Sequence, residues 1–370
     1  MNLSFWEWKT WFSDVDYTIV GSGIVGLHAA LRLRERFPNS NILILEKGVL
    51  PEGASTKNAG FACFGSLSEI LDDLRTHSEE EVIQLVTKRW QGLQLLRKRV
   101  GDAALDFRPY GGYELFLSED KHLYDECFAR MAYVNDLLRP VFRADVFSRE
   151  VDRFGFGNIN EYTLFNPFEG QLDTGKMMQA LLRMAVAQGI HVLTSVEVQN
   201  HIEHADGVEV VLPGASFKTR KLLYATNGFA GSLTGGAVKP ARAQVLVTTP
   251  IPGLDIRGTF HFDRGYYYFR NIGDRILFGG GRHLDFSGET TTEMGQTEII
   301  QQRLEQLLKD VILPDTPFEI ERRWSGIMGL GAVKKPIVEA LSSHVYCGVR
   351  LGGMGVAIGS LIGEELADLV

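Results

Sequence analysis

The segment from Asp16 to Glu46 constrains the fold more than any other part of the sequence. A short apolar run of β type leads into a Gly-x-Gly-x-x-Gly turn, a helical stretch follows, and a second apolar run ends in an acidic residue. These pieces are residues 17–20, the glycines Gly21, Gly23 and Gly26, residues 24–36, residues 42–45 and Glu46. The order predicts a βαβ unit that binds a dinucleotide. A βαβ unit with a purely structural role is the alternative.

The three glycines differ in what they allow. Gly21 permits the tight turn, Gly23 lets the backbone approach a pyrophosphate, and Gly26 lets the helix pack closely on the strand. The helix N-terminus, at Ile24 and Val25, offers unpaired N–H groups and the positive end of the helix dipole. We therefore expect the phosphates of the ligand at this turn.

Glu46 closes the unit with a carboxylate that can accept hydrogen bonds from a ribose diol. Its charge would repel a 2′-phosphate, so the sequence favours FAD or NAD over NADP. Lys47 adjoins it as a further candidate contact, although a solvated surface charge would give the same pattern.

The bulk properties bound the class of protein. A chain of 370 residues is too long for one simple core, which predicts two domains. The net charge of −8 argues against a nucleic acid as the main partner. Cys63, Cys127 and Cys347 show neither metal-ligand spacing nor a disulfide framework, so we expect no metal and a reducing compartment, the cytoplasm. No apolar run reaches the ~18 residues of a membrane span, and no signal peptide is visible.

The aromatic segment of residues 4–12 precedes the first strand. We expect it to fold against the protein as a terminal clasp. A helix lying on a membrane interface is the alternative, disfavoured because the segment is short and lacks the basic residues that such helices carry.

Nucleotide-binding features recur at the start, in the middle and at the end of the chain, separated by blocks of antiparallel-strand pattern with helices. Helices are expected over residues 79–100, behind a capping box of Ser78 and Glu81, and over residues 119–138, 174–189 and 290–309. The pattern predicts an α/β fold in which a Rossmann-like nucleotide-binding domain is interrupted twice by an α+β substrate domain with an antiparallel sheet. The predicted nucleotide-binding pieces are residues 1–75, 165–235 and 325–370, and the predicted substrate-binding pieces are residues 76–164 and 236–324.

The loop of residues 53–61 is small, polar and rich in glycine. Ser55 and Thr56 can hydrogen-bond phosphate, and the backbone from Asn58 to Gly60 can pass beside a flat ring without steric cost. An ordinary surface loop is the alternative.

Two later segments have a similar composition. In residues 223–228 a strand runs into a turn of small residues, where an open α/β sheet presents ligand contacts. In residues 348–359 a glycine-rich turn opens the last helix, whose N-terminus can stabilise negative charge on a ring. Tight helix packing through small residues is the alternative for the last segment.

At these points together the sequence resembles the FAD-dependent amine and amino-acid oxidoreductases of the D-amino-acid oxidase superfamily. The branch is the one that holds glycine oxidase, sarcosine oxidase and γ-glutamylputrescine oxidoreductase, and the resemblance spans Asp16 to Leu369. Its marks are the glycine turn with Glu46, residues 53–60, residues 225–228, residues 267–270 with 274–280, Trp324 with Gly326, and residues 353–357.

The resemblance implies an extended FAD, with its pyrophosphate on the glycine turn, its ribose on Glu46 and its adenine against the backbone of Val196. The isoalloxazine would lie between residues 55–61 and residues 353–356. The implied cofactor contacts are Gly21, Gly23, Ile24, Val25, Gly26, Glu46, Lys47, Ser55, Thr56, Lys57, Asn58, Ala59, Gly60, Phe61, Val196, Thr226, Asn227, Gly228, Gly326, Gly353, Met354, Gly355 and Val356.

The resemblance also implies a reaction, in which the α-hydrogen of an amine passes as a hydride equivalent to flavin N5 and the resulting imine hydrolyses. The chain departs from the family at some positions: Met354 stands where many members have His, and Lys57 where many have Arg. A lysine that sarcosine oxidases place near Ala357 is absent, which argues against sarcosine. The cysteine that tethers flavin in some relatives would fall near Ser325 or Gly326, so we expect non-covalent FAD.

Candidate substrate contacts surround the expected ring. Arg270 follows an aromatic strand and can pair with a carboxylate, with a domain-packing ion pair as the alternative. Tyr268, Tyr113 and Met328 are candidate walls of the pocket, with a place in the core as the alternative, and Met354 is a candidate for the environment of substrate and flavin. Arg242 and Arg282 are further candidates for charge recognition, with surface salt bridges as the alternative. An NAD-linked dehydrogenase and a flavin-bearing subunit without turnover of its own are the competing functions. The electron acceptor and the oligomeric state stay open.

Overall fold

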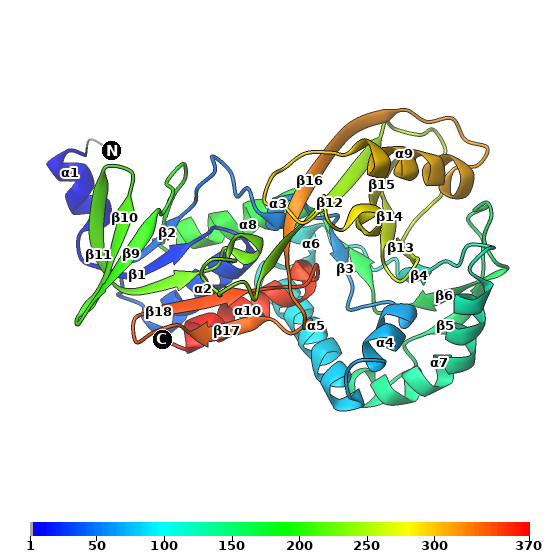
Figure 1. Cartoon of the computed structure of the whole chain (residues 1–370), viewed down its shortest axis with the longest axis horizontal. Helices are drawn as coiled ribbons and strands as arrows, with labels where there is room; N and C mark the ends of the chain where they lie inside the picture. Colours follow the sequence, from blue (N-terminus) through cyan, green and yellow to red (C-terminus); the bar gives the residue numbers. More distant parts are fainter. Residues whose placement is uncertain (1–2) are drawn as a thin grey trace.

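The computed structural model describes residues 3–370 as two lobes, each built around an eight-stranded sheet (Figure 1). The predicted first domain starts at residue 1, and residues 1–2 lie outside the described residues. Both sheets draw their strands from several separate parts of the chain, as the alternation of patterns in the sequence predicts. The predicted fold class is confirmed.

The first sheet has the strand order β17-β18-β11-β1-β2-β8, and a β9–β10 hairpin extends from β11. Its central strand, β1, pairs in parallel with both β2 and β11. The strands are β1 (Val15–Val20), β2 (Ile42–Leu45), β8 (His191–Leu193), β9 (Asn200–His204), β10 (Gly207–Leu212), β11 (Ala215–Tyr224), β17 (Ile337–Ala340) and β18 (Val345–Val349). Every residue of β2 is buried, as expected for a parallel strand covered on both faces.

Helices from distant parts of the chain pack on this sheet and on one another. They are α2 (Ile24–Arg36), α8 (Thr174–Ala187), α10 (Gly355–Asp368) and α5 (Glu79–Val100). The closing helix α10 lies directly on α2: a Cβ at Gly363 would fall 2.6 Å from the carbonyl oxygen of Val25. Ser360 of α10 donates from Oγ to the carbonyl of Gly92 in α5. The last helix therefore returns to the helix that begins at the glycine turn.

The second sheet has the order β16-β12-β15-β14-β13-β4-β6-β5, mostly antiparallel. Its strands are β4 (Gly112–Glu114), β5 (Ser148–Val151), β6 (Tyr162–Asn166), β12 (Lys239–Thr248), β13 (Thr259–Phe262), β14 (Tyr267–Ile272), β15 (Arg275–Gly280) and β16 (Ile320–Leu330). Phenylalanines fill one face, and the stacked rings of Phe260 and Phe269 lie 4.6 Å apart. The helices of this lobe are α4 (Leu67–Leu74), α7 (Lys121–Phe142) and α9 (Glu298–Leu307). The shorter elements are α1 (Phe5–Glu7), α3 (Ala54–Lys57), α6 (Asp102–Leu105) and the β3–β7 pair (Phe61–Ala62 and Gly170–Gln171).

The helix predicted over residues 290–309 is wrong in its first part, because α9 begins only at Glu298. Polar contacts hold the preceding residues in an irregular loop. Gln244 accepts a hydrogen bond from the backbone N–H of Thr297, and Ser325 accepts one from Gly295. These side chains give the backbone partners that a helix would otherwise supply.

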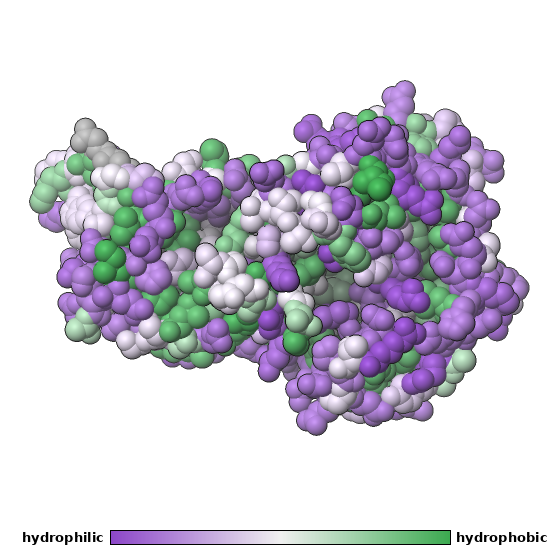
Figure 2. Space-filling view, in the orientation of Figure 1, coloured by the Kyte–Doolittle hydropathy of each residue, from purple (hydrophilic) through white to green (hydrophobic). Residues whose placement is uncertain are grey.

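The aromatic N-terminal segment clasps the first lobe through one end only. Phe12 is buried, and its ring lies 5.1 Å from that of Phe217. Phe5 and Trp6 in α1 are 67% and 71% exposed. On the face drawn in Figure 2, hydrophilic residues dominate the lobe of the second sheet. Within residues 3–370, no helix combines the length and the apolar character that crossing a bilayer requires.

Candidate active site

One cavity of about 1210 Å³ is lined by residues of both lobes. Its walls include the glycine turn after β1, the loop around α3, residues 196–201 between β8 and β9, the end of β11, and the aromatic face of β13 and β14. The segments that the sequence singles out, far apart along the chain, therefore meet around one space.

The glycine turn is sterically closed to side chains at two positions. Gly21 has φ +104°, and a Cβ there would fall 2.9 Å from the carbonyl oxygen of Ala225 at the end of β11. A Cβ at Gly26 would fall 1.9 Å from the carbonyl oxygen of Gly21. Gly26 thus lies behind the turn, where its lack of a side chain lets α2 approach β1, and the turn itself faces the cavity.

The α3 loop supplies a hydrogen-bond acceptor to one of the backbone N–H groups at the N-terminus of α2. Ser55 accepts from the N–H of Ile24 at 3.0 Å, so this hydroxyl contacts the glycine turn through the helix end. The first N–H groups of a helix have no partner within the helix. Val25 and Gly26 therefore retain donors at the end of α2.

Glu46 is buried, and its carboxylate has several donors. Its Oε2 accepts from both the N–H and the hydroxyl of Ser22, at 2.9 and 2.8 Å, and its Oε1 accepts from the N–H of Gly48 at 3.1 Å. A carboxylate oxygen can accept about two hydrogen bonds, so Oε1 keeps capacity for one more donor. Lys47 pairs with Glu197 at 2.7 Å on the surface, and both residues line the cavity.

The loop after α3 is fixed by its own side chains. Asn58 donates to the carbonyl of Ser55 at 2.8 Å, accepts from the N–H of Gly60 at 2.9 Å and accepts from the hydroxyl of Thr174 at 2.8 Å. Thr56 turns away from the cavity and donates to the carbonyl of Pro51. The loop thus presents backbone, in place of long side chains, to the cavity.

The turn before α10 is supported by the turn after β11. Asn227, with φ +43°, accepts from the N–H of Leu351 at 3.1 Å through its side chain. Gly352 and Gly353 have φ +62° and +82°, a backbone that strongly favours glycine. Gly228 lies behind, where a Cβ would fall 2.6 Å from the carbonyl oxygen of Met328.

The lobe of the second sheet contributes an aromatic and polar wall. Tyr268 lines the cavity, its ring lies 5.6 Å from that of Phe61, and burial raises its pKa to about 12. His261 lies opposite Tyr268 in the β13–β14 register and also lines the cavity. The hydroxyl of Tyr268 therefore stays protonated at neutral pH and can donate to a ligand.

The structure places Arg270 behind the cavity wall. Its guanidinium donates to the carbonyls of Ala59, Leu172 and Asn271, and burial lowers its pKa to about 10. Because three backbone acceptors hold this group, it ties the α3 loop to β14. The carboxylate contact predicted for Arg270 does not match this position.

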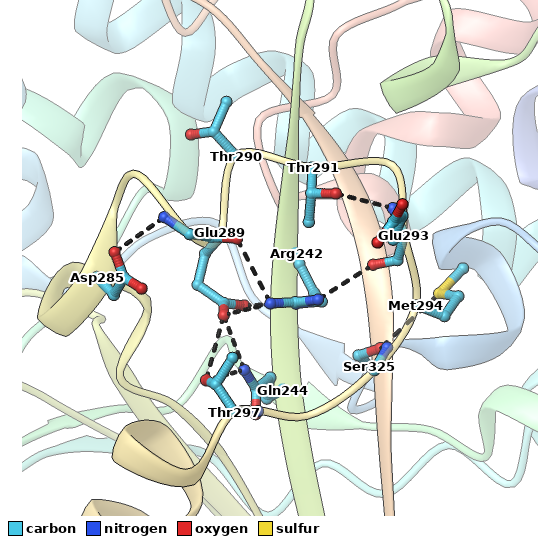
Figure 3. Close-up of polar contacts among 12 residues, drawn as sticks. Arg242, Gln244, Asp285, Glu289, Thr290, Thr291, Glu293, Met294, Thr297 and Ser325 are labelled. Carbon is cyan, nitrogen blue, oxygen red and sulfur yellow. Dashed lines mark hydrogen bonds and ion pairs between the residues drawn. The ribbon is translucent and has the colours of Figure 1, made fainter.

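The other two candidate arginines also differ from one another. Arg242 forms a two-point ion pair with buried Glu289, with Nε to Oε2 at 2.9 Å and Nη2 to Oε1 at 2.8 Å (Figure 3). Arg282 lines the cavity and has no hydrogen-bond acceptor or ion-pair partner within residues 3–370. It stacks on Phe286, with 4.7 Å from the guanidinium carbon to the ring centre, and partial burial lowers its pKa. Arg282 is thus a cation of the cavity wall that is open to an anionic ligand.

Most of the predicted site residues meet around the cavity, and six lie outside its lining: Gly26, Thr56, Tyr113, Gly228, Arg242 and Arg270. The predicted residues that line it are Gly21, Gly23, Ile24, Val25, Glu46, Lys47, Ser55, Lys57, Asn58, Ala59, Gly60, Phe61, Val196, Thr226, Asn227, Tyr268, Arg282, Gly326, Met328, Gly353, Met354, Gly355 and Val356. Five residues that the sequence did not predict also line the cavity: His261, Cys63, Glu69, Arg89 and Arg264. For His261 a signal existed: Thr-Phe-His-Phe alternates polar and apolar residues as a half-buried strand does.

Comparison with known proteins matches this geometry to one family. The family model for FAD dependent oxidoreductases, DAO, matches residues 16–369. The chain belongs to this family. It is therefore an FAD-dependent oxidoreductase, and FAD is its cofactor.

Individual relatives are distant. A probable oxidoreductase, OrdL, of Haemophilus influenzae is 19% identical over 382 positions, covering 98% of this chain and 84% of the relative. The glycine oxidase of Geobacillus kaustophilus has a TM-score of 0.76 at 20% identity, with 96% of this chain and 94% of that chain covered. The iminodiacetate oxidase of Chelativorans sp. BNC1 has a TM-score of 0.75 at 18% identity, covering 95% and 94%. At these identities the solved structures support the fold, and the substrate has to be argued from the site.

Proposed function

We propose that this enzyme oxidises the C–N bond of an amino acid or a related amine, using non-covalently bound FAD. The observation that carries the proposal is the single cavity, which joins the glycine turn at one end to the Tyr268 wall at the other. Bound FAD supplies an acceptor for the α-hydrogen of the amine and its electron pair, leaving an imine that water hydrolyses. Three of the similar proteins are named for oxidation of glycine, iminodiacetate and L-proline, and each of these compounds is an amino acid or a related amine.

The residues present fit an extended FAD. The turn at Gly21 excludes side chains, and the end of α2 offers donors to a pyrophosphate. Glu46 keeps acceptor capacity for a ribose hydroxyl. The backbone-lined α3 loop and the glycines before α10 leave room for a flat ring. We retain the predicted division into an FAD-binding domain and a substrate domain as part of this proposal.

Two features at the other end of the cavity bear on the substrate. Arg282 offers an unpaired guanidinium, which suits a carboxylate because a partly buried cation gains most from an anionic partner. Tyr268 and Phe61 supply an apolar wall with one hydroxyl donor. An amino acid satisfies both features, whereas a simple amine uses only the second. The chain itself thus binds, orients and shields the substrate, and FAD carries the redox chemistry.

The test is a visible spectrum of the purified protein, followed by anaerobic addition of amino acids and matched amines. We expect flavin absorption that acid precipitation releases into the supernatant, and bleaching by one class of compound. Flavin that stays with the precipitate would refute non-covalent binding. Flavin that no amine bleaches would favour a subunit without turnover of its own.

We propose the cytoplasm as the compartment in which the enzyme works.

A further inference from the structure

Three buried, chemically active side chains gather where the two lobes meet: Cys63, Glu169 and His261. They come from the segment after β3, the residue before β7, and β13. One polar side-chain atom from each residue lies within 4.8 Å of the corresponding atoms of the other two. The inference drawn from them rests on the proposed function, because it concerns the proton that an amine substrate must lose.

Glu169 is held on several sides. Its Oε2 lies 3.1 Å from Nε2 of His261 and 3.1 Å from the hydroxyl of Thr259, and its Oε1 accepts from Asn166 at 3.3 Å. The residue is 2% exposed. A carboxylate buried with three donors is fixed in place, so it fixes the ring of His261 in turn.

This arrangement sets the free nitrogen of His261. When Nε2 carries the hydrogen that it donates to Glu169, Nδ1 presents a lone pair. Within residues 3–370, Nδ1 has no hydrogen-bond partner, and the residue lines the cavity. The ring of His261 also packs edge-on against Phe61 at 5.2 Å, and Tyr268 is its cross-strand neighbour. His261 therefore borders the α3 loop, the segment expected beside the flavin ring.

The charges around His261 favour its protonated form. Burial disfavours charge on the imidazole, but Glu169, together with Glu69 and Glu114 farther away, more than offsets this effect, so the pKa of His261 lies above its usual value. Arg89 faces the neighbouring Cys63 from α5 and donates to the carbonyl of Phe64. A base with a raised pKa accepts a proton more readily from an ammonium group.

We propose that His261, positioned by Glu169, takes the proton that the substrate ammonium must lose before its C–N bond can be oxidised. The N–H bond of the ammonium breaks, its electron pair stays on the amine nitrogen, and the proton forms a new N–H bond at Nδ1. Glu169 does not accept this proton. Its carboxylate compensates the charge of the imidazolium, which is a positioning role.

A metal ion bound by the same three side chains is the competing reading of the cluster. Burial raises the pKa of the Cys63 thiol well above its usual value, so the sulfur stays protonated, whereas a metal ligand has to be thiolate. Nε2 of His261 and Oε2 of Glu169 already pair with each other at 3.1 Å. A hydrogen-bonded dyad accounts for both observations.

The test is the pH profile of anaerobic flavin bleaching in the holoenzyme, with saturating substrate. In the wild type we expect the rate constant to rise with pH along a limb whose pKa lies above the usual histidine value. His261→Gln should lose the limb and slow bleaching by about 100-fold or more near neutral pH. Glu169→Gln should keep the limb and move it to lower pH, because the partner that raises the histidine pKa is gone. His283→Gln is the matched control, since this histidine pairs with Asp263 on the same lobe and does not line the cavity.

A second readout does not depend on turnover. NMR titration of the histidine rings should show one pKa that is raised in the wild type, lowered in Glu169→Gln and absent in His261→Gln. If bleaching in His261→Gln keeps the wild-type rate and limb, the inference is overturned while the proposed function stands. If His261→Gln fails to fold, Glu169→Gln alone decides: an unmoved limb overturns the inference. If no amine bleaches the wild type, the proposed function itself fails, and the inference fails with it.

Discussion

The ion pair between Arg242 and Glu289 pins the loop that carries two cavity-lining residues, Thr292 and Met294 (Figure 3). Arg242 on β12 also donates to the carbonyls of Gly288 and Glu293, each at 3.4 Å. Removing this arginine should therefore affect both stability and ligand binding.

The magnitude follows from the burial of Glu289, which is 0% exposed. Arg242→Met removes two charge-assisted hydrogen bonds and leaves a buried carboxylate whose remaining side-chain donors, in the described part of the chain, are Gln244 and Thr297. Breaking a buried pair by deleting one partner costs about 3–5 kcal/mol of unfolding free energy. Replacing both partners by apolar residues removes the uncompensated charge, so the double variant Arg242→Met/Glu289→Leu should recover most of this loss.

The assay is urea unfolding of the wild type, the two single variants and the double variant with saturating FAD, combined with the Michaelis constant for substrate. We expect each single variant to be destabilised and the double variant to be more stable than either. All variants should bind substrate more weakly, since the loop is no longer tied to β12 by charge. A loss below about 1 kcal/mol in Arg242→Met, or a double variant as unstable as the sum of the singles, would refute the reasoning.

Three other outcomes are expected. Burial raises the pKa of Glu114 to about 7 despite hydrogen bonds from Ser66 and Ser68. Between these pH values the folded state holds a proton that the unfolded state releases, so the free energy of unfolding should fall by roughly 3 kcal/mol as the pH rises from about 4.5 to about 7. Denaturation at different pH values measures this loss, and Glu114→Gln should abolish it. Gly26→Ala should weaken FAD binding at least about tenfold in fluorescence titration, because its methyl would lie 1.9 Å from a carbonyl oxygen of the turn. Gly175→Ala in α8 is the control and should bind FAD normally, because Gly175 does not line the cavity and its Cβ would meet Asp173 Oδ1 at 3.3 Å. Arg282→Gln should raise the Michaelis constant for amino acids by roughly 10–100-fold and leave the Michaelis constant for matching amines unchanged. An equal rise in the Michaelis constant for both classes of compound would contradict recognition of a carboxylate by Arg282.

The parts of the fold that the sequence predicts well are those whose reasons are local. The helix of residues 24–36 has the predicted bounds, because a glycine turn starts it and Pro38 follows its end. The helix α5 begins behind the Ser78–Glu81 capping box and ends at Gly101, as expected. Each boundary depends on residues within a few positions of it.

The loop of residues 290–297 shows where local reasoning stops. Its composition permits a helix, and the helix that follows is real. The deciding contacts come from Arg242 and Gln244 on β12 and from Ser325 on β16, which are 30 or more residues away in the sequence. Only the pairing of β12 with β16 brings these side chains to the loop. No sequence pattern within residues 290–297 predicts these contacts.

Arg270 and Arg282 show that contacts distant in the sequence also decide which residue can bind a substrate. Alternation along β14 places Arg270 on the same side of the strand as Tyr268. The strand pattern does not reveal the α3 loop, whose Ala59 carbonyl accepts a hydrogen bond from the guanidinium. Arg282 follows β15 and has no such acceptor among residues 3–370, and so remains open to a ligand. The residue that recognises a substrate is therefore decided by which backbone acceptors the fold leaves within reach, and an arginine becomes a candidate only after its protein partners have been counted.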